Sequence, residues 1–441
     1  MQFELTKEFL SDLSEAIAGN NRAFLEEHVL DLHPADIAEI LNELDLEQAL
    51  IVFRALDDEC AADALTMMDE DDREEFLENL TAKEIADQVG HMDTDDAADI
   101  IGELDLEQQQ EVFGEIKDAE YVSDISQLLS YREDQAGSLM AKEFIKARMS
   151  WNVRRCIIEM RKQAEEVDKV YTIYVVDEKD RLTGTLSLKS LLFAEPNTLI
   201  SQLYMPEAIA VKADHDREEV AAIFEKYDLI VLPVVDEVGR LIGRITVDDV
   251  MDVIREEAEK DYKMASGITT SKNANRDSIW HLSRTRLPWL FVALIGGILG
   301  AFVIAEYETE LKIHPEMAYF IPLIAAMGGN VGIQSSAIVV QGLASSSIQL
   351  DSISKQVSRE LMVGIVNGVI CAGVILGYNA IIGESMELAI TVSSALLSVI
   401  LFAATFGTFV PLVLDKYDID PAIATGPFIT TTNDILGVFI Y

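Results

Sequence analysis

The carboxyl-terminal third of the chain contains five long apolar runs, and these runs restrict the fold more than any other feature. A helix of about 20 apolar residues crosses the hydrocarbon core of a bilayer. No single buried core helix accounts for five such runs in one block. We therefore expect an all-α transmembrane domain over residues 287–441, with five spans at Leu287–Ala305, Met317–Val340, Leu361–Ile382, Leu388–Leu414 and Ile423–Tyr441. The last run stops at Tyr441 and is slightly short, as if a few residues were missing.

Basic residues in the short connecting segments predict the orientation of these spans, because lysine and arginine concentrate on the cytosolic side. The two loops on one side contain Lys312 alone amid several glutamates. The segments on the other side contain Arg284, Arg286, Lys355, Arg359 and Lys416. We therefore expect the amino-terminal domains in the cytosol and, with five spans, the carboxyl terminus outside the cytoplasmic membrane.

The first residues and the cysteines agree with a cytosolic amino-terminal part. Residues 1–10 lack the basic segment and apolar run of a signal peptide. Cys60, Cys156 and Cys371 lie far apart and form no CxxC pair, which fits a reducing compartment without a disulfide framework.

The charge of the chain is strongly acidic and unevenly distributed. The formal net charge is −43, from 77 acidic and 34 basic residues, whereas only 12 acidic and 5 basic residues lie from Thr285 onward. An acidic surface repels phosphate groups, so we expect no nucleic-acid partner. It attracts cations, and carboxylates suit hard divalent ions. The alternative is that the acidic surface only aids solubility.

Three patterns precede the membrane domain. Residues 1–130 read as short amphipathic helices in a solenoid-like domain, and Ala35–Gln48 closely matches Asp95–Gln108. Residues 131–200 and 201–257 each contain a buried strand, a turn and a second strand, flanked by helical segments, which predicts two βαββα units. Residues 258–286 form a polar connecting segment, for which we expect a plug-like helix before the first span.

Asp434 is the most informative residue, because it lies inside the fifth apolar run and no run contains a basic partner. Inserting a charged side chain at membrane depth costs roughly 2.5–3.5 kcal/mol, so such a residue usually marks a functional pathway. The alternative is a protonated carboxyl group hidden in a helix bundle. A single carboxylate is poorly equipped to hold a hydrated divalent ion such as Mg²⁺. A symmetric homodimer would bring two copies of Asp434 together.

The second run contains Gly328, Gly329 and Asn330. Small residues at this position allow helices to approach closely and expose backbone carbonyls to a water-filled cavity. Pure helix packing is the competing explanation for the glycines.

The second βαββα unit resembles a cystathionine β-synthase (CBS) domain, through residues 234–236, 239–243 and 245–249. The first unit resembles another CBS domain. Tandem CBS domains commonly bind ATP or another adenine nucleotide, and the spacing of Thr246 and Asp249 matches the ribose-contacting pattern of that family. The first unit departs from the pattern, with Ser187 followed by Ser190 where the acid would stand. A purely structural pair of CBS domains is the alternative.

Taken together, the chain resembles the MgtE family of magnesium transporters and channels. The resemblance includes the acidic helical domain, both CBS units and Asp434, together with residues 131–140, 286–289, 328–334 and 426–427. It implies a homodimeric, Mg²⁺-selective channel embedded in membrane lipid. It also implies that Asp434 is the pore carboxylate and that Asn330, Gly328 and Gly329 line the route.

The family resemblance further implies a gate, in which cytosolic Mg²⁺ bridges carboxylates of the helical and CBS domains and closes the pore. Candidate ligands are Asp95, Asp96 and Asp99 on one side and Asp248, Asp249, Asp252, Glu256 and Glu259 on the other. Unscreened carboxylates repel one another, and a bound divalent cation reverses that interaction. A helix from about Ser278 to Arg286 would transmit the change to the first span. Each acid taken alone also fits an ordinary solvated helix face.

Other functions fit the sequence less well. A transporter for Co²⁺ or Mn²⁺ is the main alternative, although no cysteine or histidine lies near Asp434. A membrane metalloprotease requires a zinc motif such as HExxH, whereas the six histidines are scattered, so we expect no enzyme activity. A magnesium sensor without transport would leave Asp434 without a purpose.

Overall fold

The computed structural model describes residues 3–164, 167, 169–268, 279–344, 353–383, 385–417, 419–424 and 426–441. Its internal contacts divide the chain into two compact units, Met1–Glu257 and Ala258–Tyr441. The first unit contains the helical domain and both βαββα units, and the second contains the apolar helices.

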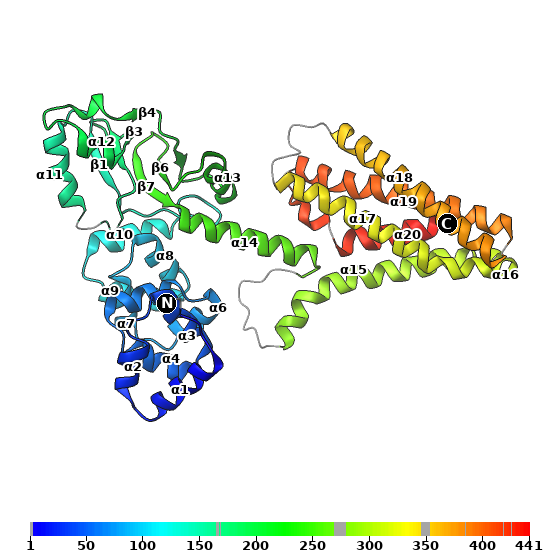
Figure 1. The fold of residues 1–441 in the computed structure, drawn as a ribbon, viewed down its shortest axis with the longest axis horizontal. Coiled ribbons are helices and arrows are strands. Elements are labelled where there is room, and N and C mark those ends of the chain that lie inside the picture. The colour runs from blue at the N-terminus through cyan, green and yellow to red at the C-terminus, as the bar shows by residue number, and fades with distance from the viewer. Residues whose placement is uncertain are drawn as a thin grey trace. The chain divides into compact units, whose positions relative to one another are not determined.

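Ten short helices form the amino-terminal domain, shown in blue to cyan in Figure 1. Alternate helices stack on one another, since α3 packs on α5, α5 on α7, and α7 on α9. This is the arrangement that the repeated helical pattern predicts. The helices are α1 (Lys7–Ala18), α2 (Arg22–His28), α3 (Pro34–Glu43), α4 (Leu46–Phe53), α5 (Asp58–Thr66), α6 (Glu70–Leu77), α7 (Ala82–Val89), α8 (Thr94–Gly102), α9 (Leu106–Glu115) and α10 (Ala119–Leu128).

Side-chain caps at the first turns explain why so many short helices form with few glycines or prolines between them. The Thr81 hydroxyl accepts a hydrogen bond from the Glu84 amide while the Glu84 carboxylate accepts one from the Thr81 amide. Asp105 and Gln108 form the same reciprocal pair at α9. Such capping boxes satisfy amide groups that the helix itself leaves unpaired.

The two βαββα units follow, and they share one topology. In the first, a sheet of order β1-β2-β3-β4 has β1 parallel to β2 and β3 antiparallel to it. In the second, β5-β6-β7 repeats the same parallel and antiparallel pairing (Figure 1). The elements are β1 (Ile145–Arg148), α11 (Val153–Gln163), β2 (Ile173–Val176), β3 (Leu182–Leu186), α12 (Leu188–Phe193), β4 (Met205–Pro206), β5 (Val211–Lys212), α13 (Arg217–Tyr227), β6 (Val231–Val235), β7 (Leu241–Thr246) and α14 (Val247–Ala265).

One hydrophobic cluster joins the helical domain to the second βαββα unit. It includes Ile100 and Ile101 of α8, Met140, Ile245 of β7 and Val250 of α14. The first βαββα unit has its own cluster, centred on Ile173 and Val175 among others. The continuous cluster brings the acidic residues of α8 to the same region as those at the beginning of α14.

The second unit contains long apolar helices, and four of them are long and apolar enough to cross a membrane. They cover Leu282–Glu306, Pro315–Leu343, Ile353–Ile382 and Met386–Lys416. The elements are α15 (Ile279–Glu306), α16 (Glu308–Ile313), η2 (Pro315–Phe320), α17 (Ile321–Ala344), α18 (Ile353–Ile382), α19 (Met386–Lys416), η3 (Pro421–Ala424) and α20 (Pro427–Ile440).

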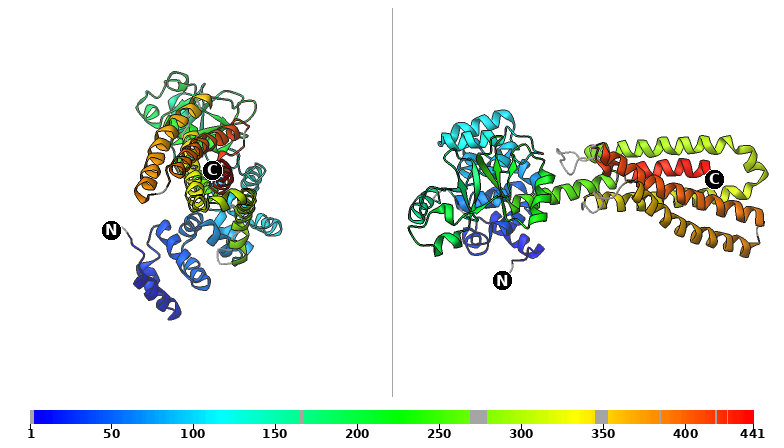
Figure 2. Two further views of the ribbon diagram at one scale, coloured as in Figure 1. Left: turned by 90° about the vertical axis from the view of Figure 1, so that its right-hand side faces the viewer. Right: turned by 90° about the horizontal axis from the view of Figure 1, so that it is seen from above.

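The predicted count of five spans is not confirmed. The fifth apolar run forms the short turn η3 and then α20, which has 14 residues and is therefore only about 21 Å long. Gly426 interrupts the run with φ +55° and ψ −126°, a conformation that favours glycine. Helix α20 packs against α15, α17 and α19. The right-hand view of Figure 2 shows α20, in red, among the long helices.

The predicted connecting helix over residues 258–286 lies partly outside the described residues, which omit 269–278. On either side of that gap, α14 ends at Ala265 and α15 begins at Ile279. Ser278, the predicted first residue of the transmitting helix, is among the residues that the structure does not describe, and the remainder to Arg286 forms the beginning of α15.

Candidate cation sites

The predicted pore residue Asp434 lies on α20, where this helix meets the glycines of α17. A Cβ atom at Gly329 would lie 3.4 Å from the Asp434 Oδ1 atom. A Cβ at Gly332 would overlap the Asn433 amide nitrogen, so only glycine permits this approach of the two helices. The structure thus brings Asp434 to Gly328 and Gly329, and both glycines are buried in the contact between helices.

Asn330 occupies a different face of α17. Successive residues of an α-helix are rotated by about 100°, and Asn330 is exposed in the single chain while its two preceding glycines are buried. Of the four predicted pore residues, the structure therefore brings together Asp434, Gly328 and Gly329, whereas Asn330 lies on another face of α17.

Two polar side chains of the membrane unit were not predicted from the sequence. Asn433 is 1% exposed, and neither its amide nitrogen nor its oxygen has a hydrogen-bond partner among the described residues. Glu360 of α18 accepts a hydrogen bond of 2.9 Å from the hydroxyl of Ser335 on α17. Asn433 was recognisable only as part of a polar stretch, and Glu360 was hidden by its nearness to the basic residues that begin α18.

In the first unit, the predicted sensor carboxylates of α8 and α14 lie close enough to interact. Burial raises the pKa of Asp95 well above its ordinary value, and the nearby Asp249 carboxylate raises it further. Burial, followed by Asp249, raises the pKa of Asp96 to about 7. Asp249 itself is raised to about 6 by burial, although a hydrogen bond from Thr246 works in the opposite direction. These carboxylates therefore repel one another in the absence of a cation.

The other predicted sensor residues lie at the rim of this group or away from it. Asp99 and Asp248 are exposed, and Asp248 contributes to the raised pKa of Asp96. The remaining three, also exposed, form ion pairs with basic residues, Asp252 with Arg255 at 3.4 Å, Glu256 with Arg217 at 3.0 Å and Glu259 with Lys263 at 3.7 Å.

A second carboxylate group lies beside the first and includes two residues that the sequence did not suggest. Carboxylate oxygens of Asp93, Asp95 and Glu143 all lie within 4.8 Å of one another. The amide and hydroxyl of Thr94 both donate to Glu143, at 3.0–3.3 Å, which fixes that carboxylate at the beginning of α8. No spacing rule could have found this set, because Glu143 lies fifty positions beyond Asp93 and belongs to another domain.

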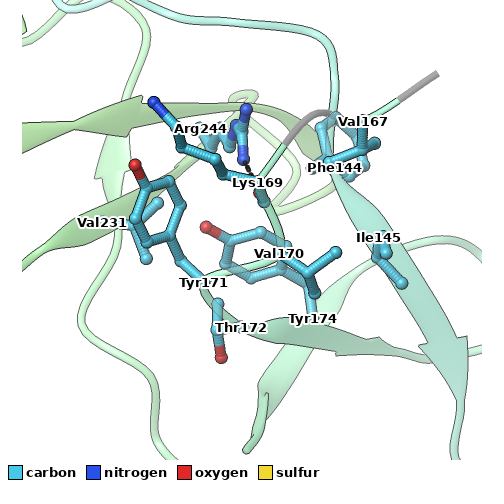
Figure 3. A pocket seen from close by; sticks show the side chains of 10 residues that line it. All are labelled: Phe144, Ile145, Val167, Lys169, Val170, Tyr171, Thr172, Tyr174, Val231 and Arg244. Carbon is cyan, nitrogen blue, oxygen red and sulfur yellow. Dashed lines mark hydrogen bonds between the residues drawn. The ribbon is translucent and has the colours of Figure 1, made fainter. Parts of the chain in front are cut away.

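The predicted nucleotide residues, Thr246 and Asp249, contact each other. The Thr246 hydroxyl donates to the Asp249 carboxylate at 2.6 Å, and Asp249 also faces the α8 carboxylates. Neither residue lines the small pocket between the CBS units (Figure 3). The walls of that pocket include the aromatic side chains of Phe144, Tyr171 and Tyr174. In the first unit, the Ser187 and Ser190 hydroxyls hydrogen-bond to each other at 2.8 Å where the acid is missing.

Comparison with known families matches nearly the whole chain. Residues 321–441 match a family described as divalent cation transporter, MgtE. Residues 32–134 match the MgtE intracellular N domain, and residues 136–197 and 200–256 match the CBS domain.

Individual relatives agree with these matches. The magnesium transporter MgtE of Thermus thermophilus is 30% identical over 97% of this chain and 96% of its own length. That of Bacillus subtilis is 30% identical over 92% of this chain and 84% of its own. Among solved structures, the cytosolic domain of the Mg²⁺ channel MgtE in complex with ATP is 34% identical with a TM-score of 0.52, and covers 55% of this chain and 99% of that one. The soluble part of a magnesium transporter is 29% identical with a TM-score of 0.51, over 57% and 99%.

Proposed function

The chain belongs to the MgtE family of magnesium transporters, and from that premise we propose that it conducts Mg²⁺ through a pore at Asp434 and closes when cytosolic Mg²⁺ binds its carboxylate sensor. The family is one of transporters rather than enzymes, and its members are multi-pass membrane proteins with a soluble amino-terminal part. Selectivity for Mg²⁺ over Co²⁺ or Mn²⁺ is part of the proposal, and transport of those ions is the alternative.

The observation that carries the pore is the place of Asp434. Its carboxylate lies in the contact between α20 and the glycines of α17. An acidic side chain retained there has a purpose if a cation passes it. Mg²⁺ keeps several of its waters when bound, so a homodimer that contributes two copies of Asp434 supplies charge without requiring full dehydration.

The proposed pore also requires a particular topology. We take η3 and α20 together as the fifth crossing, since they follow the four long helices and contact three of them. An odd number of crossings, together with a cytosolic amino-terminal unit, then places the carboxyl terminus outside. A cysteine introduced at Tyr441 should react with an impermeant thiol reagent added outside the cell, and protection from that reagent would contradict this topology.

The proposed gate depends on carboxylates of two domains that share one interface. Asp95 and Asp96 of α8 lie near Asp249 of α14, and burial, followed by the Asp249 carboxylate, raises the pKa values of both. A bound Mg²⁺ converts that repulsion into attraction and favours the conformation in which the domains are docked. Asp99, Asp248, Asp252, Glu256 and Glu259 complete the proposed set at its rim.

Uptake of Mg²⁺ into proteoliposomes tests the pore. We expect Asp434→Asn to lower the initial uptake rate by roughly tenfold or more, because each 1.4 kcal/mol lost from ion binding is a factor of ten. Glu387→Gln is the matched control, since Glu387 is an exposed carboxylate at the beginning of α19. Equal rates for Asp434→Asn and wild type would refute the pore assignment, and equal uptake of Co²⁺ or Mn²⁺ would refute the selectivity.

Binding of an adenine nucleotide is a second proposal, favoured by the similar cytosolic domain that was solved with ATP. Thr246 and Asp249 are the proposed ribose contacts. We expect ATP titrated into the full-length protein to bind one site per chain, with the affinity lowered by Asp249→Asn and unchanged by Ser190→Ala. Binding that survives Asp249→Asn unchanged would exclude this site.

A further inference from the structure

Arg244 of β7 is a buried cation where the helical domain and both CBS units meet. Its side chain is 5% exposed. One guanidinium nitrogen, Nη1, donates to the Lys169 carbonyl of the first CBS unit at 3.0 Å, and the guanidinium lies 5.7 Å from the centre of the Tyr171 ring. Figure 3 shows Arg244 beside Lys169 and Tyr171. The other nitrogen, Nη2, donates to the Asp93 carboxylate of the helical domain at 3.3 Å.

The main chain of Arg244 is tied to the same interface. Its amide donates to the Ala141 carbonyl at 2.9 Å and its carbonyl accepts from the Ala141 amide at 2.7 Å. One residue further on, the Lys142 amide donates to the hydroxyl of Thr94, the first residue of α8, at 2.8 Å. Arg244 therefore reaches the beginning of α8 by its side chain through Asp93 and by its backbone through residues 141–142.

The guanidinium of Arg244 lies beside a group of negatively charged side chains around Asp93. Asp93 is one of the three carboxylates, with Asp95 and Glu143, whose oxygens lie within 4.8 Å of one another. The ammonium group of Lys142, although adjacent in sequence to Glu143, hydrogen-bonds to Gln127 at 2.9 Å. Arg244 thus supplies a fixed positive charge at the edge of a buried acidic group that shares Asp95 with the proposed gate.

One hydrogen-bond donor of the Arg244 side chain is unpaired, so the contact between Arg244 and the helical domain can break more readily. The Arg244 Nε atom is buried and has no hydrogen-bond partner among the described residues. A buried guanidinium with an open donor is held less firmly than one whose donors are all paired. The buried ion pair joins Arg244 to Asp93, so removing either side chain leaves the other without this interaction.

We propose that Arg244 is a positioning residue of the magnesium sensor, a built-in cation that holds Asp93 and the beginning of α8 against the CBS pair when no Mg²⁺ is bound. It thereby sets how much Mg²⁺ is needed to complete docking. This inference rests on the proposed gate, and it adds that part of the docking charge is carried by the chain itself.

Hydrogen exchange of the full-length protein in detergent tests this role. In EDTA, Arg244→Gln should speed exchange of the α8 amides by about tenfold relative to wild type, because α8 loses its fixed counter-charge. Saturating Mg²⁺ should restore most of the protection, with the midpoint of the Mg²⁺ titration moved to a higher concentration. Arg244→Lys should leave the midpoint nearer to wild type than Arg244→Gln does, since the proposed requirement is the positive charge beside Asp93.

Two further variants keep the test decisive. Asp93→Asn should speed α8 exchange in EDTA like Arg244→Gln, and the double variant should add little, because both remove the same contact. Arg240→Gln is the matched control, an exposed arginine on the same hairpin that pairs with Asp236. Unchanged α8 exchange in both single variants, or an Arg244→Lys midpoint equal to that of Arg244→Gln, overturns the proposal. Failure of Mg²⁺ to protect α8 in the wild type instead overturns the gate itself.

Discussion

Gly332 shows how one absent side chain shapes the surroundings of Asp434, the proposed pore residue. The space that a Cβ atom at Gly332 would occupy is taken by Asn433 and Ile429. The Ile429 Cγ2 atom would lie 2.8 Å from such a Cβ. Asn433 precedes Asp434, so the place of the amide determines the place of the acid. Close helix packing therefore accounts for glycine at position 332 of α17, and the proposed pore at Asp434 depends on that packing.

Gly332→Ala should displace α20 from α17. Overpacking a well-packed contact typically costs about 1–3 kcal/mol, so we expect a lower temperature of thermal unfolding in detergent and slower Mg²⁺ uptake. Gly373→Ala on α18 is the control, because nothing lies within 4 Å of the added Cβ. The same effect from both variants would show that helix propensity, rather than contact with α20, is responsible.

The sensor carboxylates predict a dependence of stability on pH. Burial, followed by the Asp249 carboxylate, raises the pKa of Asp96 to about 7. Burial, with smaller contributions from Asp248 and Asp252, raises the pKa of Asp249 to about 6, and both values lie above those of the unfolded chain. The folded state therefore binds more protons, and its stability falls as pH rises through these values. In EDTA, the cytosolic unfolding transition of the full chain should occur at a higher temperature at pH 6 than at pH 8.

Mg²⁺ should reduce this pH dependence, because a bound divalent ion takes the place of the protons. Asp96→Asn and Asp249→Asn should each flatten the pH profile measured in EDTA by differential scanning fluorimetry. A profile that rises toward pH 8 in the metal-free wild type would contradict the raised pKa values.

At the scale of helices and strands, much of the fold was predictable from local patterns. The paired strand–turn–strand segments identified both CBS units, and the 35–48 and 95–108 repeat identified the stacked helices. The span count was not predictable in this way, because hydropathy does not register the backbone break at Gly426. The Asp93, Asp95 and Glu143 group was equally hidden, since it forms only when α8 packs beside the beginning of the first CBS unit.

Gly426 is the point at which α20 becomes a separate short helix. Its φ of +55° with ψ of −126° is strained for any residue with a Cβ, and a Cβ there would overlap the Ala265 carbonyl oxygen. Gly426→Ala should cost of order 1–3 kcal/mol. We expect lower thermal stability and altered Mg²⁺ uptake, measured against Gly377→Ala, where an added Cβ meets open space. Normal uptake and stability would show that the break before α20 is not required.

Across the whole molecule, acidic residues are in large excess, so both ordinary salt and bound Mg²⁺ should reduce their repulsion. An experiment can separate the two effects. A monovalent salt screens repulsion between carboxylates over about 10 Å at 0.1 M, whereas a bridging ion reverses its sign. In EDTA, raising KCl should therefore protect the helical domain from limited proteolysis only in part. Millimolar Mg²⁺ at constant ionic strength should protect it fully. Equal protection by both salts at equal ionic strength would remove the need for a specific site.

The continuous hydrophobic cluster between α8 and α14 has a consequence for how such a sensor is adjusted over time. Burial of apolar side chains favours docking of the two domains, and repulsion between carboxylates at the same interface opposes it. The free energy of docking is therefore a small difference between two large opposing contributions. Trimming a methyl group from Ile101 or Val250 changes that difference without altering any ligand. Core substitutions can therefore shift the range of Mg²⁺ concentration to which the proposed sensor responds, while the side chains that bind the ion stay the same.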